Sequence, residues 1–125
     1  INPEDIAVNA LALRGLDPGL RSVAVPSDDG PMHVTAPGDL TARRESGRLV
    51  VEVRYVPGQV LYVTLAPVAT VEGLRLEAEG EGLTRRERLE PGETGWAWDE
   101  DLAVLAAGVR ADERGRALLV QTLED

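Results

Sequence analysis

The stretch Arg48-Leu-Val-Val-Glu-Val-Arg-Tyr-Val-Pro-Gly-Gln-Val-Leu-Tyr-Val-Thr-Leu65 decides the fold of this 125-residue chain. Side chains alternate between the two faces of a β-strand, so every second residue shares a face. The apolar sets are Leu49, Val51, Val53 and Tyr55 in the first half, and Leu61, Val63 and Leu65 in the second. This period of two predicts two strands that each bury one face.

The connection Pro57-Gly58-Gln59 between these halves predicts a β-hairpin with an odd, three-residue loop. An odd loop pairs Val53 with Val63, so that both apolar sets fall on the same side of one sheet. A loop of even length would set Val63 beside Glu52, and the register would oppose burial of the apolar face. The stretch therefore predicts a one-sided antiparallel sheet.

Short apolar runs separated by turn residues continue along the chain, and the turns are rich in Gly, Pro and Asp. The further predicted strands are 21–25, 32–36, 40–44, 70–79, 83–89 (an exposed edge strand or its approach), 95–99, 102–109 (a strand or a short helical turn) and 116–123. Seven to nine short segments without strand–helix alternation are typical of an antiparallel sandwich or barrel. We therefore expect one all-β domain over residues 1–125, an antiparallel β-sandwich of immunoglobulin- or fibronectin-like architecture.

Residues 1–16 fit two interpretations. Asn2 suits a helix N-cap, Pro3 the first helical position and Gly15 a helix stop, which favours a short N-terminal helix. The alternation of apolar residues that begins at Ile6 also fits a first strand. Both alternatives stay open at this point.

Composition narrows the classes of partner. The formal net charge is −9, and an acidic surface disfavours nucleic acid and anionic membranes, which bind clustered basic residues. Cysteine is absent, so the chain has no disulfide, thiolate metal site or cysteine nucleophile. No apolar run reaches the roughly 18 to 20 residues of a membrane span. We expect no cofactor, no metal and no membrane insertion.

Trp96 and Trp98 are the candidate binding residues. Spaced by two, they share one face of the predicted strand 95–99. On a solvent face, two indoles would form a stacking platform for sugar rings or an apolar partner. On an inner face, they would anchor a core that contains no Phe, and burial statistics favour this interpretation. One buried indole with the other at the rim is a third alternative.

The remaining chemical groups form no recognisable constellation. The acidic loops 28–30 and 99–101 lack the alternating oxygen ligands of a calcium loop, so solvated turns are favoured. His33 is the only histidine, which excludes a multi-histidine metal site and favours a surface position. The serines that it could join in a hydrolase are Ser22, Ser27 and Ser46. None of them lies in a nucleophile motif.

These features predict a non-catalytic binding or structural module of an envelope or extracellular protein or assembly. Its partner would be a protein, or a second copy of the chain, that pairs with an exposed edge strand. The alternative is a carbohydrate-binding module that holds a polysaccharide through Trp96 and Trp98. A small enzyme centred on His33 is the third hypothesis.

Overall fold

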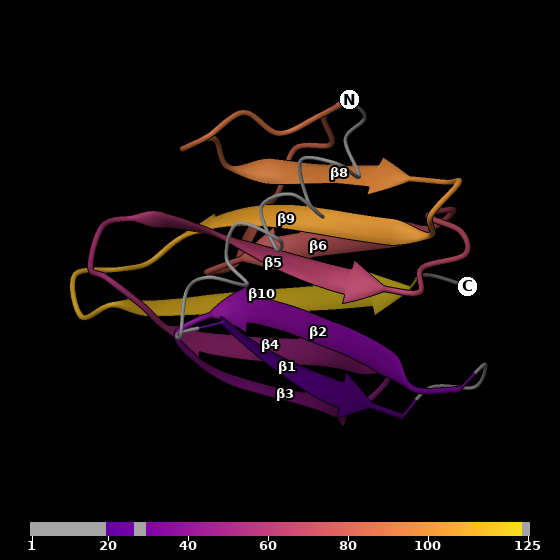
Figure 1. Ribbon diagram of the computed structural model, residues 1–125, viewed down its shortest axis with the longest axis horizontal. Coiled ribbons are helices and arrows are strands. Elements are labelled where there is room, and N and C mark those ends of the chain that lie inside the picture. The colour runs from indigo at the N-terminus through magenta and orange to yellow at the C-terminus, as the bar shows by residue number, and fades with distance from the viewer. Residues whose placement is uncertain (1–19, 27–29, 124–125) are drawn as a thin grey trace.

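In the computed structural model, which describes residues 20–26 and 30–123, the chain forms a sandwich of two antiparallel sheets (Figure 1). Sheet A has the strand order β1-β2-β5-β9-β8, and sheet B has the order β3-β4-β10-β6-β7. The strands are β1 Leu20–Val25, β2 Met32–Pro37, β3 Asp39–Glu45, β4 Arg48–Arg54, β5 Val60–Ala66, β6 Leu74–Ala78, β7 Glu81–Gly82, β8 Gly95–Asp99, β9 Val104–Arg110 and β10 Arg116–Leu123. The predicted all-β antiparallel sandwich is confirmed, with no helix among the described residues. The helix or strand predicted over residues 1–16 lies outside them.

The stretch 48–65 forms two strands, but it is not a hairpin. β4 pairs with β3 and β10, whereas β5 pairs with β2 and β9, so the two strands belong to opposite sheets. The predicted pairing of Val53 with Val63 is wrong, because Val53 lies opposite Ala117 and Val63 lies opposite Ala107. The two apolar faces meet across the core instead of side by side. A sandwich and a one-sided hairpin both bury every second residue, so alternation alone does not separate them.

The loop fails to close a hairpin because its hydrogen bonds go elsewhere. Residues 55–59 cross from sheet B to sheet A beside a second crossing, which joins β9 to β10. The backbone N–H of Tyr55 donates to the carbonyl of Gly115 (2.7 Å), and that of Gly58 donates to the carbonyl of Ala111 (3.1 Å). At Gly115 (φ +80°) a Cβ would collide with the carbonyl oxygen of Tyr55, so only glycine allows the two crossings to touch.

The core lies between the two sheets and contains the apolar sets that the alternation predicts. Their members Leu49, Val51, Val53, Leu61, Val63 and Leu65 are each at most 2% exposed. One cluster of buried residues spans both sheets and also includes residues of β2, β6, β8, β9 and β10. Interdigitating side chains from two inner faces are the usual core of a sandwich.

Two predicted strands depart from the structure. Of residues 70–79, only Leu74–Ala78 pairs, along β10. Residues 83–89 form no edge strand beyond a single parallel bridge between Arg85 and Trp96. Instead, residues 83–94 (the covering segment) cross the outer face of sheet A, where Leu89 is 3% exposed and packs against Ala97 and Ala106. The burial of Leu89 anchors the segment on this face. In the sequence, the charged residues around Leu89 gave no indication that it would be buried.

Candidate functional site

The two tryptophans lie on the inner face of β8. Trp96 is 6% exposed and belongs to the main core, and the guanidinium carbon of Arg85 lies 5.2 Å from the centre of its indole ring. Trp98 is half-buried at the rim of the same core, and its indole N–H donates to the carbonyl of Val68 (2.8 Å). The structure therefore places one indole in the core and the other at its edge.

The outer edge of β8 is closed by the covering segment. The backbone N–H of Trp96 donates to the carbonyl of Thr84 (3.0 Å), and the N–H of Arg86 donates to the carbonyl of Trp96 (2.7 Å). The side chain of Arg86 adds a bond from Nε to the carbonyl of Thr94 (2.8 Å). These bonds satisfy backbone groups that a bare edge would present to another chain.

The two edges of sheet B are protected in other ways. β7 has only two residues, which is too short to template a partner strand. β3 carries four charges in seven residues, and one of them, Arg44, donates from Nε to the carbonyl of Pro26 just beyond β1 (2.7 Å). Charged residues on an edge strand disfavour pairing with another chain.

β1, the fourth edge strand, is neither as short as β7 nor as highly charged as β3. It carries one charge, Arg21, in six residues, and the side chains of Ser22 and Ala24 are exposed. Within the described part of the chain, no segment pairs with the side of β1 that faces away from β2. We therefore take the outer edge of β1 as the candidate interaction site. The sequence analysis predicted binding at an exposed edge strand and named residues 83–89 as such an edge, but these residues form only an isolated bridge at Arg85.

The remainder of the fold holds β1 firmly in place. All six of its residues pair with β2, and Val25 is 2% exposed. Arg44 binds beyond one end of β1, and Arg21 pairs with Asp39 of β3 near the other (3.8 Å). A strand held at both ends presents its backbone to a partner with little further loss of conformational freedom.

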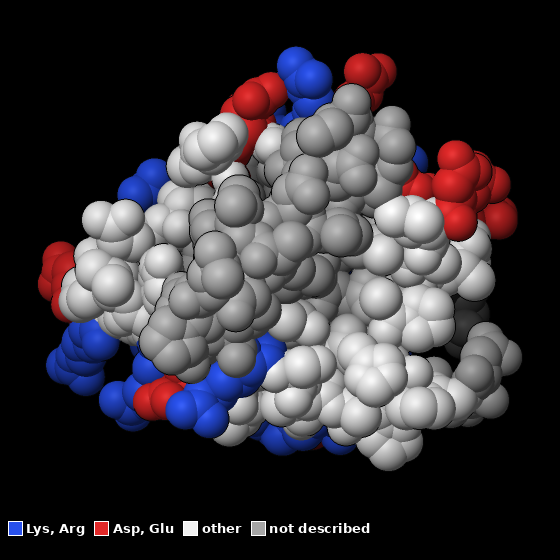
Figure 2. All heavy atoms as spheres, viewed as in Figure 1, with Lys and Arg blue, Asp and Glu red and all other residues white. Residues whose placement is uncertain are grey.

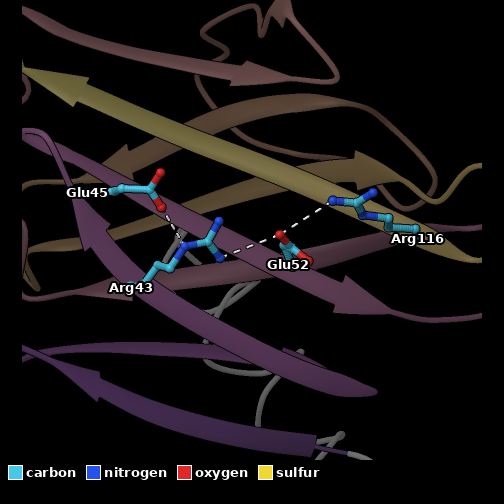
Figure 3. A network of polar contacts seen from close by, with 4 residues as sticks. All are labelled: Arg43, Glu45, Glu52 and Arg116. Carbon is cyan, nitrogen blue, oxygen red and sulfur yellow. Dashed lines mark hydrogen bonds and ion pairs between the residues drawn. The ribbon is translucent and has the colours of Figure 1, made fainter.

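The outer face of sheet B carries a network of ion pairs (Figure 3). Arg43 binds Glu45 (2.6 Å) and Glu52 (3.5 Å), and Glu52 also binds Arg116 (3.4 Å). The hydrogen bond with Glu45 raises the pKa of Arg43 above its ordinary value. All four side chains are a third or more exposed, so solvent screens the network and each pair contributes little to stability.

His33 and the acidic loops do not assemble a reactive centre in the described residues. His33 is exposed on the outer face of sheet A, opposite Ala24 and Ala66, and no hydrogen bond joins it to Ser22 or Ser46. Asp99 accepts a bond from the backbone N–H of Leu102 (2.8 Å), which makes it a turn-capping residue. Ser27, Asp28 and Asp29 lie outside the described residues.

Across residues 20–26 and 30–123, no group of three or more His, Asp or Glu side chains is placed to hold a metal ion. The same residues contain no helix long and apolar enough to cross a membrane.

A shallow hollow on the outer face of sheet B was not found by sequence reasoning. Its volume is about 220 Å³, and its walls are Asp39, Thr41, Glu52, Val53, Arg54 and Arg116. These residues come from β3, β4 and β10. The pairing of β4 with β10, which brings Arg54 and Arg116 together, has no signal in the sequence.

Comparison with known proteins yields little. No known protein family matches the sequence, and no curated protein is significantly similar to it. Among solved structures, the chain is similar to a GH31 dextranase of Flavobacterium johnsoniae, FjDex31A, complexed with glucose, at 11% identity and a TM-score of 0.47. The similarity covers 82% of this chain but spans only 15% of the dextranase. A likeness at this level supports no argument about function.

Proposed function

We propose that this chain is a non-catalytic interaction module that binds an extended strand of a second protein along the free edge of β1. One observation carries the proposal: no other described segment pairs with the outer edge of β1, which carries one charge, while the edges at β3, β7 and β8 are charged, short or covered. Strand addition to such an edge gives affinity through backbone hydrogen bonds and specificity through alternate side chains.

The charge of the molecule favours a different protein over a second copy as the partner. Two copies would each bring a net charge of −9, and repulsion between like-charged proteins opposes their association. β1 itself contributes only the positive charge of Arg21. In the view of Figure 2, both acidic and basic side chains lie along the outline of the molecule. We therefore infer a neutral or basic partner strand.

The immunoglobulin- or fibronectin-like relation and the place in an envelope or extracellular assembly belong to the same proposal. The polysaccharide alternative has less support. Arg85 lies over the indole ring of Trp96, and the indole N–H of Trp98 donates to the carbonyl of Val68. Stacking on a sugar ring requires an accessible indole face.

Amide hydrogen exchange tests the first step of the proposal. In the isolated protein, the N–H groups of β1 that point away from β2 should exchange at nearly the solvent rate, while the N–H of Trp96, bonded to Thr84, should be protected. Uniform protection of β1 in the isolated protein would show that its edge is already occupied and would contradict the proposal.

A matched pair of variants tests the second step. Ala24→Lys places a charge on β1, and Ala69→Lys makes the same change at an exposed position outside the strands. Proteins retained by the unmodified chain and by Ala69→Lys, but lost by Ala24→Lys, are the expected partners, and their complexes should protect the amides of β1 from exchange. Equal retention by all three chains, or protection located elsewhere, would exclude the β1 edge as the site.

A further inference from the structure

Two arginines lie directly opposite one another on the outer face of sheet B. Arg54 of β4 is flanked across the sheet by Asp39 of β3 on one side and by Arg116 of β10 on the other. Like charges at directly opposite positions of an antiparallel pair destabilise the sheet. An anion bound between the two arginines would offset this repulsion.

The anions that the fold supplies are already shared with other cations. Asp39 is paired with Arg21 (3.8 Å), and Glu52 forms ion pairs with both Arg43 and Arg116. Within the described part of the chain, Arg54 has no ion pair within 4 Å. Two groups of ion pairs, Arg21–Asp39 and Arg43–Glu45–Glu52–Arg116, are each neutral, and Arg54 belongs to neither. Arg54 therefore leaves one positive charge without an ion pair, in a chain of net charge −9.

The surplus charge faces a space of suitable size. The two arginines stand in the wall of the hollow of about 220 Å³, and Thr41 supplies a hydroxyl there. Pockets for whole drug-sized ligands are larger, about 300 to 1,000 Å³, so this space suits a single small group. Arginine guanidinium groups match the planar, two-oxygen geometry of a carboxylate.

We propose that this hollow is a binding site for one carboxylate, held between the guanidinium groups of Arg54 and Arg116. A singly charged anion balances the one unpaired charge of Arg54, whereas a phosphate dianion would exceed it and would be repelled more strongly than a carboxylate by Asp39 and Glu52. The carboxylate comes from a free small acid or from an acidic side chain of a peptide. The site lies on β3, β4 and β10, away from the edge of β1, so this proposal does not depend on the proposed function.

Titration followed by NMR of the arginine Nε–H groups tests this site. Acetate should give saturable shifts at Arg54 and Arg116, and inorganic phosphate at equal ionic strength should bind at least several-fold more weakly. A glutamate residue blocked at both ends serves as the second carboxylate: tighter binding than acetate identifies a peptide side chain, and equal binding identifies a free acid. Linear shifts without saturation for both carboxylates would overturn the proposal.

Two variants separate binding from a general effect of charge. Arg54→Gln should abolish the saturable shifts at Arg116 and raise the melting temperature without ligand, because it removes the repulsion between the two arginines. Arg75→Gln is the matched control, since Arg75 lies on β6 of the same sheet and pairs with Glu77 (3.2 Å). If Arg75→Gln weakened acetate binding as much as Arg54→Gln, the shifts would report surface charge alone and the site would be excluded.

Discussion

Asp112 shows how one side chain fixes the turn between β9 and β10. Its Oδ1 accepts hydrogen bonds from the backbone N–H groups of Arg114 (2.8 Å) and Arg116 (2.9 Å). These bonds, first that from Arg116 and then that from Arg114, lower the pKa of Asp112 below its ordinary value of 3.8. A carboxylate that accepts backbone N–H bonds within its own turn is a common device for holding such a turn.

The lowered pKa predicts a specific dependence of stability on pH. A group with a depressed pKa in the folded state stabilises fully above its unfolded pKa and loses that contribution as the pH falls through the folded value. Asp112→Asn should therefore unfold at lower urea concentration than the native chain at pH 7, and the difference should shrink as the pH falls below 3.8. Glu113→Gln, at the exposed neighbouring position, is the control. A difference that stays constant down to pH 2 would contradict this account of the turn.

Among the described residues, Gln121 has a buried side-chain oxygen without a hydrogen-bond partner. It points inward from β10 between Leu49 and Leu76, it is 7% exposed, and its Oε1 has no hydrogen-bond partner. A buried acceptor without a partner costs about 1 to 3 kcal/mol.

Replacement of this glutamine by an unbranched apolar residue of similar length should stabilise the protein. We expect Gln121→Met to raise the free energy of unfolding by about 1 kcal/mol, measured by urea denaturation, because the desolvation cost disappears. Gln59→Met changes the same residue type at an exposed position and should have little effect. If Gln121→Met lowered stability, the amide would have to form a bond that the structure does not show.

At the level of secondary-structure elements, the crossings between sheets decide the topology. Gly38 joins β2 of sheet A to β3 of sheet B with φ +85°, and a Cβ at this position would collide with the carbonyl oxygen of Arg54. Gly47, in the turn between β3 and β4, has a similar φ of +78° but open space around it. An alanine at Gly47 would therefore cause backbone strain alone, whereas an alanine at Gly38 would cause the same strain and a steric clash.

Alanine substitution at these two glycines should give unequal losses of stability. Gly47→Ala should cost about 1 to 2 kcal/mol, the usual penalty of a left-handed conformation for a residue with a Cβ. Gly38→Ala should cost at least about 2 kcal/mol more, because β3 must also move away from β4. Urea denaturation of both variants measures the difference, and equal losses would mean that the crossing is looser than the structure shows.

For the whole molecule, the dominant electrostatic term is repulsion among its acidic groups. The chain has 22 acidic residues against 13 basic ones, and the ion pairs of the described residues are exposed. Exposed pairs contribute at most about 1 kcal/mol each, and a net charge of −9 opposes the compact state throughout.

Added salt should therefore stabilise the protein at neutral pH. Sodium chloride raised to about 0.5 M, where the screening length falls to a few ångströms, should increase the urea midpoint of unfolding. The increase should vanish near pH 4.6, the isoelectric point of the sequence, where the repulsion disappears. A midpoint that falls with salt at pH 7 would show that the ion-pair network outweighs the net charge.

The fold class, most of the strands and their buried faces followed from the sequence because they depend on neighbours along the chain, whereas the strand predicted at 83–89 is absent and β7 was missed. The alternation at Leu49, Val51 and Val53 predicts which side chains are buried, and this prediction does not depend on which strand lies beside them. Turn residues such as Gly47 similarly mark where strands end.

Only the tertiary structure decided which strands pair. β4 lies beside β10 rather than β5, and this contact brings Arg54 next to Arg116. The order of sheet A places β1 at an edge, where no other segment of residues 30–123 pairs with its outer side. It also decided that Trp96 is buried while Trp98 reaches the rim. Such contacts join residues far apart in the sequence, and their energies depend on packing between whole faces, which a period of two leaves undetermined.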